Sequence, residues 1–167
     1  MIKVKKLNPD AVLPKFAHNT DAGADLFTCE ALLLEPGEKG IAKTGIAIQL
    51  PPGYSASIRP KSGMTVKGVP CLVEHWITDS ALGSHVEIVE ERVDVTVYLG
   101  LIDNAYRGDI GIMVKNESEF SIVIPKHTKL AQIVLEKYYQ ECFVEVDELA
   151  ETDRGEGGFG STGYKLI

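Results

Sequence analysis

The sequence has few cysteines, a single tryptophan and no long run of apolar or of basic residues. Cys29, Cys71 and Cys142 are odd in number and far apart, and their spacing matches no metal-ligand pattern, so we expect neither a disulfide nor a zinc site. No segment approaches the roughly 20 apolar residues of a membrane span. The first residues begin strand-like alternation without an apolar signal core, so we expect a cytoplasmic protein with no membrane attachment.

The net charge of the chain limits the classes of partner that it can bind. The formal net charge is −7, and lysine and arginine form no long run, which argues against a nucleic-acid backbone or an anionic membrane as the partner because both require clustered cations. A small anionic ligand remains compatible if cations gather locally. A length of 167 residues with 44 % hydrophobic content fits one compact domain with a real core.

Helical periodicity is scarce, and short segments with strand-like patterning recur between glycines and prolines. They lie at residues 41–50, 54–59, 109–115, 121–124 and 130–136. This spacing predicts an all-β sandwich or barrel. We expect the β domain to span residues 1–153 and the remainder, 154–167, to form a flexible tail, since five of the ten residues from 154 to 163 are glycines.

The segment 64–99 contains two alternating apolar patterns on either side of residues 90–92. Val86 and Ile88 lie on one side, and Val93, Val95 and Val97 on the other, which predicts a β-hairpin that turns near Glu90 to Arg92. The acidic residues between the valines suit a solvent-facing surface. A solvated hairpin without chemistry is therefore the alternative to a partner-binding insert.

An acidic residue followed by an aromatic marks the segment 100–108, Gly-Leu-Ile-Asp-Asn-Ala-Tyr-Arg-Gly. Asp103 follows an apolar strand, where a carboxylate can accept a proton from water and so activate it for phosphoryl attack. Tyr106 offers a flat apolar face at the same turn. Taken alone, the segment could equally be an acidic turn.

The tail combines a cation, permissive backbone, one aromatic and two hydroxyls. Closely spaced glycines let backbone N–H groups wrap an anion. Arg154 can meet a phosphate bidentately, Ser161 and Thr162 can donate to it, and Phe159 can stack on a base. A disordered tail is the alternative, and the lone Phe159 among glycines favours the binding interpretation.

Three further segments are weak signals by themselves. Ser62 beside Gly63 could donate to a phosphate, and Gln132 is a polar residue in an apolar strand that needs a partner if buried. Asp21 and Asp25 flank a glycine-bearing turn, which fits a turn cap or a site near a metal equally well.

These five segments, in this order, resemble the five sequence motifs of the trimeric dUTPase family (deoxyuridine 5′-triphosphate nucleotidohydrolases). Residues 21–26 match the first motif, 60–63 the second, 100–108 the third, 131–132 the fourth, and the tail matches the fifth almost residue for residue. The resemblance covers nearly the whole chain except residues 64–99. Five ordered motifs are far more specific than any single glycine-rich loop.

The resemblance implies a fold, an assembly and a reaction. The fold would be an all-β, distorted jelly-roll-like barrel with an inserted hairpin and a flexible C-terminal tail. The assembly would be a homotrimer whose three active sites are each built from three subunits. The reaction would be hydrolysis of dUTP to dUMP and pyrophosphate by attack of water on the α-phosphorus, which limits uracil incorporation into DNA and supplies dUMP for dTMP synthesis.

The resemblance also implies residue roles. Asp103 would be the base that activates water, and Gln132 would help to order the site. The backbone before Asp103, at Gly100 and Ile102, would read uracil, and Tyr106 would pack on the deoxyribose. The other substrate contacts would come from Lys61, Ser62 and Gly63 and, in a neighbouring chain, from Arg154, Phe159, Gly160, Ser161 and Thr162.

Mg²⁺ is the cofactor that the resemblance implies, held by triphosphate oxygens and waters, with Asp25 near it through water at most. This arrangement fits the reluctance of magnesium to shed water. Lys61 stands where the family usually has arginine, so the charge is kept but the bidentate fork is lost.

Two other functions compete with this one. A dCTP deaminase shares the implied fold, but its catalytic glutamate would align with Met113, and a thioether cannot carry protons. A regulatory protein that binds a partner through the insert at 64–99 is the other alternative. Because the catalytic side chains are all present, we expect hydrolysis to persist even if the insert binds a protein.

Overall fold

Antiparallel strand pairing makes up nearly all of the regular structure in residues 1–79 and 83–158, the part of the chain that the computed structural model describes. The strands are β1 (Lys3–Lys6), β2 (Gly23–Phe27), β3 (Leu32–Leu34), β4 (Lys39–Lys43), β5 (Ile46–Gln49), β6 (Tyr54–Pro60), β7 (Val69–Asp79), β8 (Gly83–Val93), β9 (Val95–Val97), β10 (Gly100–Ile102), β11 (Gly111–Asn116), β12 (Ile122–Ile124) and β13 (Lys129–Lys137). One short helix, α1 (Ser62–Lys67), follows β6.

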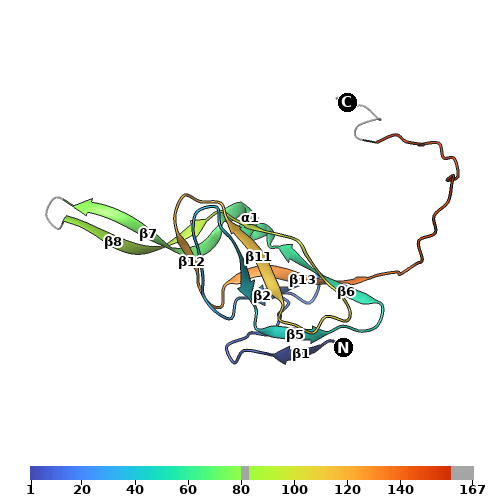
Figure 1. The fold of residues 1–167 in the computed structure, drawn as a ribbon. Helices are drawn as coiled ribbons and strands as arrows, with labels where there is room; N and C mark the ends of the chain where they lie inside the picture. Colours follow the sequence, from blue (N-terminus) through green and yellow to red (C-terminus); the bar gives the residue numbers. More distant parts are fainter. Residues whose placement is uncertain (80–82, 159–167) are drawn as a thin grey trace.

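The strands form four small sheets that close around one core, the distorted jelly-roll-like arrangement expected from the sequence (Figure 1). The sheet that carries most of the candidate site has the order β10-β6-β13-β2. The others have the orders β1-β5, β4-β11-β9 and β3-β12-β7-β8. Neighbouring strands are often far apart in sequence, so each sheet brings distant motifs together.

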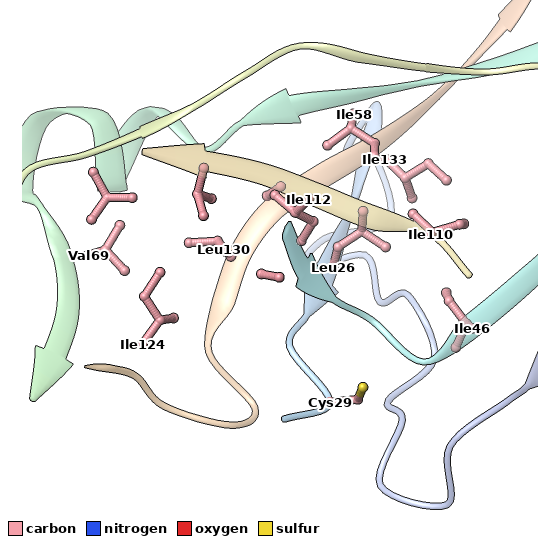
Figure 2. Packing of buried hydrophobic residues seen from close by; sticks show 14 of the residues in the cluster. Leu26, Cys29, Ile46, Ile58, Val69, Ile110, Ile112, Ile124, Leu130 and Ile133 are labelled. Atoms are coloured by element: carbon pink, nitrogen blue, oxygen red, sulfur yellow. The ribbon is translucent and has the colours of Figure 1, made fainter. Parts of the chain in front are cut away.

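The core consists mostly of branched aliphatic side chains, with several alanines and two cysteines, that the facing sheets contribute (Figure 2). Leu26, Ile46, Ile112 and Leu130 come from four different strands and are fully buried. Each such side chain contributes roughly 1.5–3 kcal/mol when it is removed from water. This packing fixes β2 and β13, on which several of the candidate site residues lie.

The strands predicted at 54–59, 109–115, 121–124 and 130–136 are confirmed as β6, β11, β12 and β13, with small shifts at their ends. The strand predicted at 41–50 is wrong in one respect, because it is two strands, β4 and β5, in different sheets. The break occurs at Gly45, whose φ of +69° disfavours other residues and whose added Cβ would lie 2.8 Å from Asn8 Cβ. A continuous apolar run in the sequence does not show that the chain passes from one sheet to another.

A hairpin in the inserted segment is confirmed, but its predicted turn at residues 90–92 and its predicted second strand are wrong, because Val95 and Val97 lie on β9, which pairs with β11 in another sheet. β8 runs unbroken through these residues, and its partner is β7, with Val73 opposite Val89 and Asp79 opposite Gly83. The strands are therefore joined across 80–82, which lie outside the described residues. Glu90 and Glu91 resemble a turn in the sequence, yet β8 is an edge strand and its charged side chains can reach solvent.

The hairpin β7–β8 projects from the body, and residues 138–158 leave it as an extended arm (Figure 1). The side chains of this arm are exposed, including those of Phe143, Val144, Val146 and Leu149. The arm has no strand or helix over its described length. Within residues 1–79 and 83–158, no helix has the length and apolar character needed to cross a membrane.

Candidate functional site

The Asp103 turn, residues 103–106, begins where strand β10 ends. β10 pairs with β6 through Gly100 opposite Ile58 and Ile102 opposite Ala56, and this pairing stops at Ile102. The backbone N–H of Tyr106 donates to the carbonyl of Asp103 over 3.1 Å and closes the turn. The Asp103 side chain is thereby presented to solvent at the edge of the buried sheet.

Side-chain hydrogen bonds hold this turn in shape. The Asn104 amide donates to the carbonyls of Pro51 at 2.6 Å and Tyr54 at 2.9 Å, and the Tyr106 hydroxyl donates to the carbonyl of Asp109 at 2.9 Å. Gly108 leaves room for the Tyr106 ring, because a Cβ at this position would lie 2.4 Å from the tyrosine oxygen.

A pocket lies beside the turn and is lined by four of the predicted residues, Gly100, Ile102, Asp103 and Tyr106. Its remaining lining is mostly aliphatic and comes from β4, β6, β10, β11 and the two residues before β11, among them Asp109. The Asp109 carboxylate accepts from the backbone N–H of Gly45, so such a pocket can accept a flat base and a sugar while Asp103 presents its carboxylate to them. Met113 also lines it, so the position that would carry a glutamate in a deaminase holds a thioether at the pocket wall.

A second group of predicted residues surrounds the buried carboxylate of Asp25. Its oxygens accept from Lys61 Nζ at 2.6 Å and lie 3.3 Å from Lys129 Nζ, and the Gln132 amide lies at 3.5 Å. Burial raises the pKa of Asp25, but the hydrogen bond and charge of Lys61, with help from Lys129 and Gln132, outweigh burial and hold the pKa below its ordinary value of 3.8. Two cations thus share one carboxylate and leave a positive surplus for an anion.

Backbone geometry positions these groups. Asp25 on β2 lies opposite Gln132 on β13, and Gln132 lies opposite Arg59 on β6. Gly23 leaves space for the Gln132 side chain, since a Cβ there would lie 3.1 Å from Gln132 Cβ. Ser62 and Gly63 follow Lys61 in the first turn of α1, and an added Cβ at Gly63 would meet open space.

The two groups lie apart in a single chain. Ile102 is level with Leu135 of β13 through Ala56 of β6, so Asp103 is about four residues along and two strands across from Gln132. At about 3.3 Å per residue and 4.8 Å per strand, their Cα atoms are separated by roughly 16 Å. Asp103 and Gln132 of one chain therefore cannot contact the same atom of a ligand.

The tail residues are only partly described. Arg154 is exposed, and its guanidinium Nε donates to the carbonyl of Gly157 at 2.8 Å within a local turn of the arm. The predicted contacts of Phe159, Gly160, Ser161 and Thr162 fall outside the described residues.

No group of three or more histidine, cysteine, aspartate or glutamate side chains in the described ranges is arranged to hold a metal ion. The Asp25 carboxylate, whose side chain is 3 % exposed, is occupied by two lysines. The residues present therefore do not fit a magnesium site formed by protein alone. A magnesium ion carried by phosphate oxygens and water needs none.

Two residues of the site escaped the sequence analysis. Lys129 contacts Asp25, 104 positions earlier in the chain, and only strand pairing reveals the contact. Asn104 looks like an ordinary turn residue, and its amide acceptors are 50 or more positions away. Lys129 lies two positions before the fourth motif, residues 131–132, so its charge was a usable signal, whereas Asn104 offered none.

Comparison with known proteins places these features in context. The dUTPase family model matches residues 10–92 and 90–163. The deoxyuridine 5′-triphosphate nucleotidohydrolase of Clostridioides difficile is 39 % identical over 163 residues, covering 98 % of each chain. A Staphylococcus bacteriophage 80alpha dUTPase solved with dUPNHPP superposes with a TM-score of 0.77 at 27 % identity, covering 98 % of this chain and 99 % of that one. A mutant dUTPase from phage phi11 of S. aureus, described with a structural Mg(II) ion, gives a TM-score of 0.68 at 25 % identity over 89 % of this chain and 97 % of its own.

Proposed function

Since this chain belongs to the dUTPase family, we propose that it hydrolyses dUTP to dUMP and pyrophosphate at sites built from the Asp103 turn of one chain and the Asp25 cluster, Asp25, Lys61, Lys129 and Gln132, of another. The observation that carries the shared site is the separation of roughly 16 Å between Asp103 and Gln132 in one chain, estimated from strand register. The Asp103 turn alone lacks the phosphate-binding end of the site, and the Asp25 cluster alone lacks the general base.

The Asp103 turn supplies the base-reading pocket and the general base. Uracil enters the pocket at the backbone of Gly100 and Ile102, and the deoxyribose packs on Tyr106. Asp103 accepts a proton from the water that attacks the α-phosphorus. The exposed carboxylate at the end of a buried strand supports this role, because it is fixed at its base and open to water on its other side.

The Asp25 cluster supplies the phosphate end. Asp25 neutralises one of its two lysines, so the cluster retains about one positive charge for the triphosphate. Ser62 and Gly63 follow Lys61 in the first turn of α1, and the open space over Gly63 allows a phosphate to approach its backbone. Mg²⁺ supplies charge neutralisation when it arrives with the triphosphate, with Asp25 at most a water-mediated neighbour.

The arm supports a homotrimer. Val144 and Val146 are exposed on the arm, and an apolar cavity of about 200 Å³ near β1 is lined by Ile2, Val4 and other aliphatic side chains. β1 also has an unpaired edge, because its only partner in the described part of the chain is β5. A neighbour's arm can add to this edge as a strand, with its carboxylates near the lysines of β1. This exchange would carry residues 154–167 to another chain, where they close over the nucleotide.

The hairpin is the surface we propose for a protein partner. Trp76, Val86 and Ile88 alternate onto one face of β7–β8, and all three are exposed, Trp76 by 78 %. Glutamates flank them, so the partner would present a basic and apolar surface. A photo-crosslinking amino acid at Trp76 should capture a cellular protein, and one at exposed Leu33 should not. A hairpin that is only solvated captures nothing at either position.

Mixed assemblies test the shared site. Asp103→Asn alone should retain dUTP binding and lose about 10²- to 10⁴-fold in kcat, the usual contribution of a general base. Gln132→Ala alone should also have weak hydrolytic activity. Because the two defects lie in different halves, trimers assembled from equal amounts of both variants should regain about a quarter of their sites by random mixing. Pyrophosphate release that stays at the level of the separate variants would refute sharing. An unchanged rate for Asp103→Asn would remove Asp103 as the base.

The chemistry of the cysteines supports a cytoplasmic location as the final part of the proposal. Cys29, Cys71 and Cys142 are all free thiols in the structure. Proteins of reducing compartments keep their thiols in this state.

A further inference from the structure

Asn104 follows Asp103 directly and connects the Asp103 turn to a distant part of the chain. Its half-buried amide nitrogen donates to the carbonyl oxygens of Pro51 at 2.6 Å and Tyr54 at 2.9 Å. We propose that Asn104 is a positioning residue that holds the Asp103 carboxylate in its working place. The proposal rests on the role of Asp103 as general base in dUTP hydrolysis.

The end of the strand ladder explains why such a residue is needed. Backbone pairing between β10 and β6 stops at Ile102 opposite Ala56, so Asp103 is the first residue without ladder support. The Asn104 amide continues the attachment on the other side of Asp103. The carboxylate therefore stands between two fixed points, the backbone of Ile102 and the side chain of Asn104.

Other bonds of the turn cannot replace this attachment. Within the described residues, the Arg107 guanidinium donates to the carbonyls of Asn104 and Tyr106, and the Tyr106 hydroxyl donates to that of Asp109. The Arg107 bonds stay within the turn, and the Tyr106 bond ties it to Asp109, whose carboxylate accepts from the backbone N–H of Gly45 at 2.9 Å. Among the described residues, the two bonds of Asn104 are the side-chain bonds of residues 103–107 that attach the turn to the segment 51–54 before β6.

The segment that receives these bonds is itself rigid. Pro51 and Pro52 restrict the backbone, and the N–H of Tyr54 donates to the carbonyl of Pro51 at 3.2 Å. The N–H of Tyr138, at the root of the arm, donates to the carbonyl of Gly53 at 3.1 Å. Asn104 thus anchors the turn to the segment 51–54, which is continuous with β6 and is bonded to Tyr138 at the start of the arm.

The chemistry of the side chain matches the anchor. An asparagine NH₂ group has two donors, which the two carbonyl acceptors satisfy together. Aspartate has the same shape but would direct acceptor oxygens at those carbonyls, and alanine would leave the anchor empty. The effect of substitution should therefore follow the number of donors rather than the size of the side chain.

The first experiment measures steady-state dUTP hydrolysis of Asn104→Ala and Asn104→Asp. Both should lower kcat by on the order of 10- to 100-fold, since a misplacement of about 1 Å can cost ~10²-fold, while KM for dUTP and the melting temperature stay near those of the wild type. Asn8→Ala is the control, because the Asn8 side chain also caps a turn, at the backbone N–H of Asp10, and does not line the pocket beside Asp103. It should leave kcat unchanged. A wild-type kcat in either Asn104 variant overturns the proposal.

The second experiment repeats Asn104→Ala in an Asp103→Asn background. If Asn104 acts only by placing the Asp103 carboxylate, the double variant should be no slower than Asp103→Asn alone. An additional loss equal to that of the single variant overturns the proposal. A wild-type kcat for Asp103→Asn itself would instead show that Asp103 is not the general base, which contradicts the proposed function. If Asn104→Ala does not fold, Asn104→Asp takes its place in both experiments, because it keeps the shape of the side chain and loses both donors, and a wild-type kcat in Asn104→Asp refutes positioning.

Discussion

Removing Lys61 should destabilise the protein in a way that depends on pH, because it leaves a buried carboxylate short of a partner. The Asp25 side chain is 3 % exposed, and Lys61 Nζ contacts it at 2.6 Å. Breaking a buried ion pair typically costs about 3–5 kcal/mol. Lys129, at 3.3 Å and about half exposed, compensates for part of this, so we expect Lys61→Met to lower the free energy of unfolding by about 2–3 kcal/mol at pH 7.

The sign of the pH dependence follows from the pKa of Asp25. In the wild type this pKa lies below 3.8, so the ion pair stabilises the protein at neutral pH and that stability is lost as the pH falls through the lowered pKa. Without Lys61, its hydrogen bond and charge no longer lower the pKa while burial still raises it, so the variant takes up a proton at a higher pH than the wild type and its penalty shrinks as the pH falls. The difference in unfolding free energy should therefore decrease from pH 7 to pH 4.

Urea unfolding measures this difference directly, at one fixed protein concentration because an oligomer's stability depends on concentration. Lys43→Met is the matched control, since Lys43 pairs with Glu30 at 3.2 Å on the surface, where a pair contributes less than about 1 kcal/mol. Equal losses for Lys61→Met and Lys43→Met, or a Lys61→Met loss that is constant between pH 4 and pH 7, would refute the buried-pair reasoning.

Three further predictions concern the core, the hairpin and the pocket. Burial raises the pKa of the Cys71 thiol from 9.0 to about 11, so the contribution of Cys71 to the free energy of unfolding should be lost as the pH rises from 9 to 11, by up to about 3 kcal/mol. Unfolding experiments at alkaline pH that compare the wild type with Cys71→Ala measure this loss, and Cys142→Ala, at an exposed cysteine, is the control. Replacing residues 74–88 by Asn-Gly should preserve folding and dUTP hydrolysis, because Val73 and Val89 face each other and can flank a two-residue turn; an insoluble product would make the hairpin part of the core. Gly108→Ala should lower kcat/KM by at least about tenfold, since its Cβ displaces the Tyr106 ring; an unchanged kcat/KM would exclude that ring from the site.

The strands that alternation predicted are those with one face in the core and one in water. β11 and β13 are of this kind, and their burial alternates along the strand. β2 could not be found in this way, because all five of its residues are buried and glycine, alanine and aspartate are among them. β7 was missed and β8 was cut short because two charged residues in a strand resemble a turn. Only the partner strand, through pairs such as Val73 with Val89, shows where the hairpin ends.

The candidate site divides in the same way between local and distant information. Asp103 and Tyr106 lie three residues apart, so a sequence motif contains their relationship, and the structure places both beside one pocket. The contact of Asp25 with Lys129 depends on the pairing of β2 with β13, which no local pattern encodes.

The proposed division of the site between chains is still harder to predict from the sequence. Motif order names Asp103 and Gln132 without saying whether they belong to the same site in one chain. Strand register supplies the separation, because β10, β6 and β13 hold the two residues roughly 16 Å apart on one sheet. A loop could close such a gap, but both residues are attached to paired strands over a packed core. Our proposal that both act in one reaction therefore requires a catalytic unit larger than the folding unit, and the exposed apolar arm is the part of the chain that we propose joins the chains.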